Sequence, residues 1–304
     1  MLDMNIQSAF DQNEIADESA TNGRRVVMRR AGFGLASLAA ASLLTSRPAA
    51  AATTDADVFN FALNFEYLGA EYYLRAVTGQ GLSAFSSVTG VGTQGTVVGG
   101  SPVPFQSPSV AYYAQQLAND ELAHVRFIRE ALGTAAIAEP TIDLADSWSL
   151  LAEAAGLAPA GGSFNPYANE VNFLLGAYVL EDVCVSALAG AAMLLTNPNN
   201  VSYAASMLAA EGYQAGAIRG YLSDIGGGAA TNAISALRAT LSGTFDNGTD
   251  ADSNPFNITN VDYNGQVARR STSQILSIAY GTSVSGTSKG LFFPNGVNGA
   301  ITTI

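Results

Sequence analysis

Apolar residues recur every three to four positions along five stretches that follow residue 53, which is the spacing of one buried face of an α-helix. Thr54 or Asp55 can cap the first stretch and Gly79 can end it, while Ser107-Pro108 opens the second. The pattern predicts helices over residues 55–77, 108–132, 166–195, 198–226 and 229–241.

The segments between the predicted helices are polar or rich in glycine. Residues 79–107 are expected to form a long loop, with a short hairpin as an option, and residues 134–163 a connection with one short helix near 149–155. Two long helices, a long connection and two more long helices follow one another in the order of a ferritin-like bundle. The sequence therefore predicts an all-α fold, a ferritin-like four-helix bundle over residues 53–241 with one long crossover and a short fifth helix.

The last part of the chain, residues 242–304, is rich in Asn, Gly, Ser and Thr. We expect an irregular C-terminal extension, packed on the bundle or extending from it, in which residues 272–280 form a short helix or strand. The stretch 246–252 superficially suggests a calcium loop, but it lacks the full ligand spacing and a closing glutamate, so it is expected to be a polar loop.

The first 52 residues have the three regions of an export signal. Two arginine pairs, 24–25 and 29–30, precede an apolar run from Ala31 to Leu44, and an alanine-rich stretch ends near Ala52. The adjacent arginines resemble a twin-arginine signal, although Gly23 stands where Ser or Thr is usual. An amphipathic first helix is the alternative, but the alanine run has no polar face. We expect removal of residues 1–52 and a periplasmic or extracellular protein.

Composition limits the partners. The chain of 304 residues is 48% hydrophobic and 12% charged, which suits a sizeable core, and its net charge of −12 disfavours nucleic acid and anionic lipid. No membrane association is expected after signal removal, and the formation of a homo-oligomer is left as an open possibility. Cys184 and His124 are the sole residues of their types, so an intrachain disulfide and a Cys/His zinc cluster are excluded.

Each of the four long predicted helices carries a glutamate in an apolar stretch, and two of these glutamates have a polar residue three positions later. Residues three or four apart share a helix face, so these polar residues interrupt core stripes. Buried carboxylates need a compensating charge, and carboxylates with an imidazole suit iron or manganese, with zinc as an option. The candidate metal ligands are Glu66, Glu121, His124, Glu181, Glu211 and Gln214.

Other polar residues have weaker patterns. Tyr73 lies two turns after Glu66 and is either a hydrogen-bond partner of a site carboxylate or a plain core residue, and Tyr213 is a second candidate of that kind. Cys184 is expected to be a small core residue. Four glutamates are expected on solvated helix faces: Glu71, Glu130, Glu153 and Glu170.

Several motifs together resemble the ferritin-like proteins that include the plant desiccation-related proteins and bacterial exported relatives. They are Asn64-Phe65-Glu66-Tyr67-Leu68, Glu71-Tyr72-Tyr73, Glu121-Leu122-Ala123-His124, Leu180-Glu181-Asp182, and the segments 211–219, 270–276 and 290–296. The resemblance implies a bundle with di-iron-type ligands at Glu66, Glu121, His124, Glu181 and Glu211. The second Glu-x-x-His of the family is Glu211-x-x-Gln214 here, and a glutamine coordinates only through a neutral oxygen.

Three functions remain open. The first is a metal-binding oxidoreductase that uses iron and oxygen or peroxide, or a manganese catalase-like activity. The second is a non-enzymatic stress, desiccation or assembly protein with a degenerate site. The third is metal sequestration without turnover. No catalytic residue is assigned from the sequence.

Overall fold

A computed structural model describes residues 53–250 and 256–304, so the expected export signal over residues 1–52 lies outside the described residues. The elements in chain order are α1 (Asp55–Thr78), η2 (Leu82–Ala84), β1 (Val97–Gly99), α2 (Pro108–Leu132), η3 (Gly133–Ala135), β2 (Ile142–Leu144), α3 (Asp146–Ala154), α4 (Glu170–Ala191), α5 (Pro198–Asp224), α6 (Gly228–Ser242) and α7 (Thr272–Tyr280).

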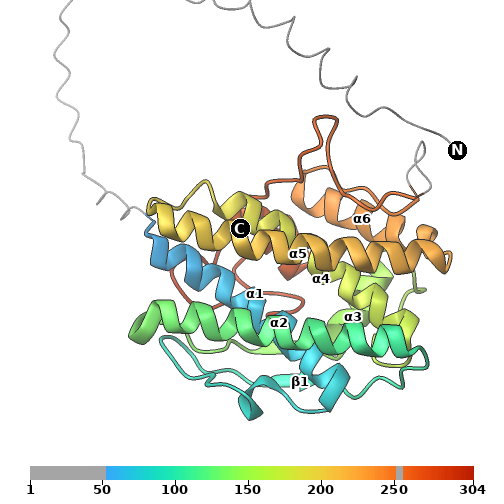
Figure 1. The fold of residues 1–304 in the computed structure, drawn as a ribbon, viewed down its shortest axis with the longest axis horizontal. Coiled ribbons are helices and arrows are strands. Elements are labelled where there is room, and N and C mark those ends of the chain that lie inside the picture. The colour runs from blue at the N-terminus through green and yellow to red at the C-terminus, as the bar shows by residue number, and fades with distance from the viewer. Residues whose placement is uncertain (1–52, 251–255) are drawn as a thin grey trace, which may run out of the picture. The chain divides into compact units, whose positions relative to one another are not determined.

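Two helix pairs make the bundle. α1 packs along α2 and α4 packs along α5, and α1 also contacts α4, as Figure 1 shows. The long connection from α2 to α4 crosses the bundle and contains β2 and α3. The predicted all-α ferritin-like bundle is confirmed.

The helix ends show why each stretch starts and stops where it does. Thr54 and Asp57 form a capping box at the start of α1, and Gly79 ends that helix in a left-handed conformation. α4 begins at Glu170 rather than 166, because the side chain of Asn169 accepts the backbone N–H of Asn172 and caps the helix there.

The hairpin considered for residues 79–107 is absent from the described chain. Instead, β1 pairs in parallel with β2, with Val97 opposite Ile142. The backbone N–H of Val91 also bonds to the carbonyl of Ala136, so the long loop runs beside the crossover. The partners in both pairs are 45 residues apart, so local turn signals do not reveal the pairing.

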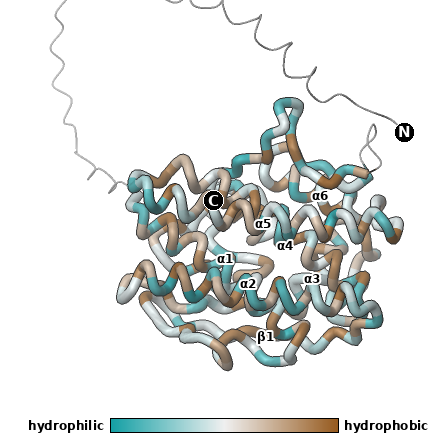
Figure 2. Tube along the Cα trace, viewed as in Figure 1, coloured by the Kyte–Doolittle hydropathy of each residue, from teal (hydrophilic) through white to brown (hydrophobic). Residues whose placement is uncertain are grey.

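α4 is a mostly buried helix of the bundle. Among the described helices it is the one long and apolar enough to cross a membrane, yet 78% of its most apolar stretch is buried inside the protein. Hydrophobic and hydrophilic residues are interspersed along the helices (Figure 2). α2 and α5 each have a buried and an exposed face, whereas α1 is buried along most of its length.

The C-terminal extension is more ordered than the sequence suggested. Residues 272–280 form a helix, and Phe292 and Phe293 are buried against the bundle. The segment around Asp246 was expected to be a polar loop, but the side chain of Asp246 is buried and forms ion pairs with Arg238 and Arg270, each at 2.8 Å. Asp182 of α4 pairs with the same Arg238 at 2.9 Å, so an internal ion-pair network fixes the extension to the bundle.

Glu71 was expected to face solvent and is buried. Its carboxylate pairs with Arg75 at 2.5 Å and accepts the backbone N–H of Leu82 at 2.7 Å, so it holds η2 against α1. Glu130 and Glu153 are exposed as predicted, while Glu170 is half-buried and accepts two backbone N–H groups before α2.

Candidate metal centre

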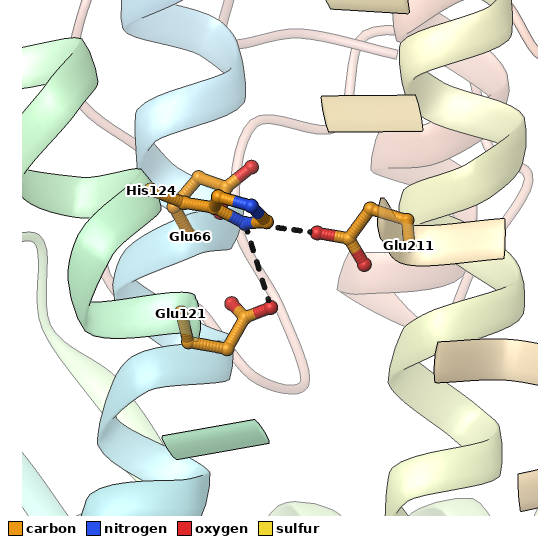
Figure 3. A group of neighbouring side chains, drawn as sticks. All are labelled: Glu66, Glu121, His124 and Glu211. Atoms are coloured by element: carbon orange, nitrogen blue, oxygen red, sulfur yellow. Dashed lines mark ion pairs between the residues drawn. The ribbon is translucent and has the colours of Figure 1, made fainter. Parts of the chain in front are cut away.

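Four predicted ligands meet between α1, α2 and α5. One oxygen each from Glu66, Glu121 and Glu211 and one nitrogen of His124 all lie within 4.8 Å of one another (Figure 3). Nδ1 of His124 is 3.2 Å from Glu211, 3.3 Å from Glu66 and 3.9 Å from Glu121. The three carboxylates are at most 3% exposed, so the group forms a compact and nearly dry cluster.

Helix periodicity and one glycine bring these side chains together. Glu121 and His124 lie one turn apart on α2 and therefore point to the same side. Gly69 on α1 faces Glu121, and a Cβ atom at position 69 would overlap Oε2 of that glutamate. The missing side chain of Gly69 gives the carboxylate its room beside the α1 backbone.

Glu181 lies beside this cluster rather than within the group of four. It is 1% exposed, contacts the carboxyl group of Glu211, and accepts a hydrogen bond from the hydroxyl of Tyr73 through Oε1. Tyr73 is thus placed against a site carboxylate, as one of the two sequence interpretations expected. Glu181 extends the centre from α5 towards α4.

Gln214 lies one turn after Glu211 and is 4% exposed. Its Nε2 donates to Oδ2 of Asp120 at 3.2 Å, and its backbone carbonyl accepts the hydroxyl of Tyr113 at 2.7 Å. Because a carboxylate only accepts hydrogen bonds, this contact fixes which end of the amide is the oxygen. The carbonyl oxygen Oε1 faces away from Asp120 and is buried.

Sequence reasoning did not assign roles to Asp120 and Tyr113. Asp120 directly precedes Glu121, and Tyr113 lies on the same stripe of α2 as Glu121, so their positions were the available signal. The partner in both cases is Gln214, which is 94 and 101 residues away along the chain. That distance is the reason the pairs were missed.

The prediction that Tyr213 lies beside a site carboxylate is wrong. Tyr213 is 82% exposed. It follows Glu211 by two positions, which is a rotation of about 200° around a helix, so it points away from the centre.

Burial dominates the electrostatics of the centre. It raises the pKa values of Glu66, Glu121 and Glu181 above the ordinary range, and the negative charge of Glu211 adds to each effect. Burial alone lowers the pKa of His124, but close polar contacts with Glu211 and Glu66 outweigh it and raise that pKa to about 12. Without a bound cation, burial therefore favours the protonated forms of Glu66, Glu121 and Glu181, while its contacts favour the charged imidazole of His124.

The donor atoms fit a divalent cation. Within the described residues, seven buried side-chain atoms of this group form no well-directed hydrogen bond: Glu66 Oε2, Glu121 Oε1, His124 Nδ1, Glu181 Oε2, Glu211 Oε1 and Oε2, and Gln214 Oε1. Buried polar atoms are costly unless they are paired or coordinate a metal. Oxygens with one imidazole nitrogen make a donor set that suits iron or manganese.

Comparison with known proteins agrees with this class of fold. The ferritin-like domain family matches residues 54–224, which run from the cap of α1 to the end of α5. The chain belongs to the ferritin-like domain family.

Two relatives narrow the position within the family. The chain is 31% identical over 174 residues to the desiccation-related protein PCC13-62 of Craterostigma plantagineum, covering 56% of this chain and 53% of that protein. It is 27% identical over 272 residues to the ferritin-like catalase Nec2 of Nesocodon mauritianus, covering 81% of this chain and 84% of that protein. The alignment thus spans about half the length of the first relative. No solved structure matches the chain.

Proposed function

We propose that this protein is an exported metalloprotein that binds one or two iron or manganese ions in the centre of its bundle. The observation that carries the proposal is the convergence of Nδ1 of His124 with oxygens of three buried glutamates that have no well-directed hydrogen bond within the described chain. Three ionised carboxylates in one buried cluster would repel one another, and a bound cation would remove that cost.

Different residues of the centre would hold the first and the second ion. Glu66, Glu121, Glu211 and His124 would hold the first ion, and Glu181 and Gln214 would supply oxygens for a second. A bound iron or manganese ion would supply redox chemistry with peroxide or dioxygen. The name of the Nesocodon relative favours a catalase activity, the conversion of hydrogen peroxide to water and dioxygen.

Tyr73 keeps a proton beside the centre. Burial raises the pKa of its hydroxyl well above the ordinary range, and the adjacent carboxylate of Glu181 raises it further. The phenol therefore stays protonated and donates to Oε1 of Glu181. This hydrogen bond leaves the other oxygen, Oε2, free to face a cation.

Metal analysis of the protein, purified from the compartment to which it is exported, tests the proposal. We expect one or two ions per chain in the wild type and less than half of that content in Glu121→Ala and His124→Ala. Glu130→Ala is the matched control, since Glu130 is exposed on the same helix. Metal content at background in the wild type, or equal content in all three variants, would refute the site.

Gln214 favours one alternative, a protein that keeps the fold and has a weak or degenerate site. The neutral amide oxygen is a poorer ligand than an imidazole or carboxylate. In that case the buried carboxyl groups stay protonated, and Glu181→Leu stabilises the protein because it removes a buried polar group. In a metal-loaded protein the same change costs stability and metal content. The two results separate the metalloprotein from a stress or desiccation protein without chemistry.

A further inference from the structure

Two small cavities border the centre along the seam between α1 and α4. The first, of about 30 Å³, lies between α1, α4 and α7 and reaches Glu121 and Glu181. The second, of about 20 Å³, lies between α1 and α4 alone and reaches Glu66. Phe65 and Cys184 line both cavities, so these two side chains separate one from the other.

The cavity walls are apolar. Besides the three glutamates and the thiol of Cys184, the lining residues are glycine or carry hydrocarbon side chains. A bound water needs two to four polar partners, and apolar cavities of this kind stay dry and take apolar guests. Away from the carboxyl groups, the walls therefore disfavour water and peroxide and accept a small apolar molecule.

The second cavity adjoins the protein surface. Ala62, Ala187 and Ala191 line it and are all partly exposed, and Cys184 is partly exposed as well. The first cavity lies deeper, where Ile278 of α7 and Phe292 cover the seam. A molecule that enters beside the alanines meets Glu66 first and passes Phe65 and Cys184 to reach Glu121 and Glu181.

We infer that the two cavities form a passage for dioxygen between the surface and the carboxylate centre, with Cys184 and Phe65 as its constriction. Each cavity has room for about one small molecule, because a cavity volume of about 10–15 Å³ is enough for one water. The passage thus admits a diatomic gas and excludes larger organic substrates. Its use rests on the proposed function, in which dioxygen is either consumed at the centre or released from it.

Trp148 gives a readout that needs no metal. It is the one tryptophan of the chain, is fully buried, and its ring lies 4.8 Å from that of Phe292, which lines the first cavity. Dioxygen that moves through the passage will quench the phosphorescence of Trp148. We expect Cys184→Leu, which fills the constriction, to lower the quenching rate constant on the order of tenfold, because packed interiors leave no path around it.

Three controls complete the experiment. Cys184→Ala widens the constriction and should quench at least as fast as the wild type. Ala187→Leu narrows the partly exposed mouth without adding volume to the deep core, and it should slow quenching even if Cys184→Leu fails to fold. Acrylamide, a polar quencher, should not distinguish these variants. Equal dioxygen quenching in the wild type and Ala187→Leu would overturn the passage.

Crystals pressurised with krypton provide a second measurement, and we expect gas bound in both cavities. Krypton absent from both would overturn the inference. Metal content is measured on the same samples and should match the wild type in the Cys184 and Ala187 variants. A wild type without metal that still shows the quenching pattern would refute the proposed function and leave the passage standing.

Discussion

Nδ1 of His124 lies 3.2 Å from Oε1 of Glu211, and this contact joins α2 to α5 across the interior of the bundle. His124 is the one histidine in the chain, and it contacts glutamates from three helices. The imidazole therefore joins the two helix pairs at the centre, together with the contacts of Gln214 with Asp120 and of Tyr73 with Glu181.

Stability of the metal-free protein should fall as pH rises. The folded-state pKa values of Glu66, Glu121 and Glu181 lie above their ordinary value of 4.5, and that of His124 lies at about 12, above 6.5. In each case the folded protein keeps a proton that the unfolded chain releases. The stabilisation from that group is therefore complete below its ordinary pKa, and it is lost as the pH rises towards the pKa of the group in the folded protein. Each such group contributes a slope of up to about 1.4 kcal/mol per pH unit.

Chemical denaturation between about pH 5 and pH 8 measures this slope. Metal should reverse it, because cations compete with protons for the same ligands and bind better at high pH. Glu121→Gln should flatten the slope of the metal-free protein. A metal-free protein that gains stability over this range would contradict the assigned pKa directions.

Gly69→Ala should weaken the metal site without breaking the helix. The new Cβ would overlap Oε2 of Glu121, so the carboxylate must move. We expect this displacement of a ligand to lower the metal affinity about 10-fold or more. Competition with a coloured chelator measures the affinity. Gly212→Ala is the matched control, because no atom lies within 4 Å of a Cβ there and alanine favours α5 by up to about 1 kcal/mol.

Gln214→His should increase the affinity for a second metal ion. Asp120, which now accepts a hydrogen bond from Nε2 of Gln214, can accept one from an imidazole, and that pairing strengthens a histidine ligand. Metal titration should show a second ion bound about 10-fold more tightly or better. Gln214→Leu, which has no donor atom, should bind it more weakly than the wild type. Equal binding in both variants would show that position 214 does not contribute a ligand.

Asp246→Ala should release the C-terminal extension. It would leave Arg238 and Arg270 buried with less compensating charge, which costs about 3–5 kcal/mol of unfolding free energy. Urea denaturation measures the loss, and limited proteolysis should cut the chain after residue 246. Arg269→Ala is the control, since Arg269 is exposed and its loss should cost less than about 0.5 kcal/mol. Equal stability of the two variants would argue against the network.

Part of this protein follows from the sequence alone. The 3.6-residue period and the caps at Thr54 and Gly79 are local signals, and they predicted the long helices within a few residues. The same period placed Glu121 and His124 on one face of α2. The glutamates on the other long helices stood out because each interrupts an apolar stripe, and an interrupted stripe is visible without any partner.

The tertiary structure decided the rest, because burial and pairing depend on residues far away in the chain. Glu71 has the same local pattern as an exposed glutamate, and it is buried because Arg75 and the loop at Leu82 close over it. The parallel pairing of β1 with β2 depends in the same way on distant residues. Asp246 looks like part of a polar loop until the arginines of α6 and the extension reach it. Periodicity fixes which face of a helix a residue occupies, whereas only packing determines what that face meets.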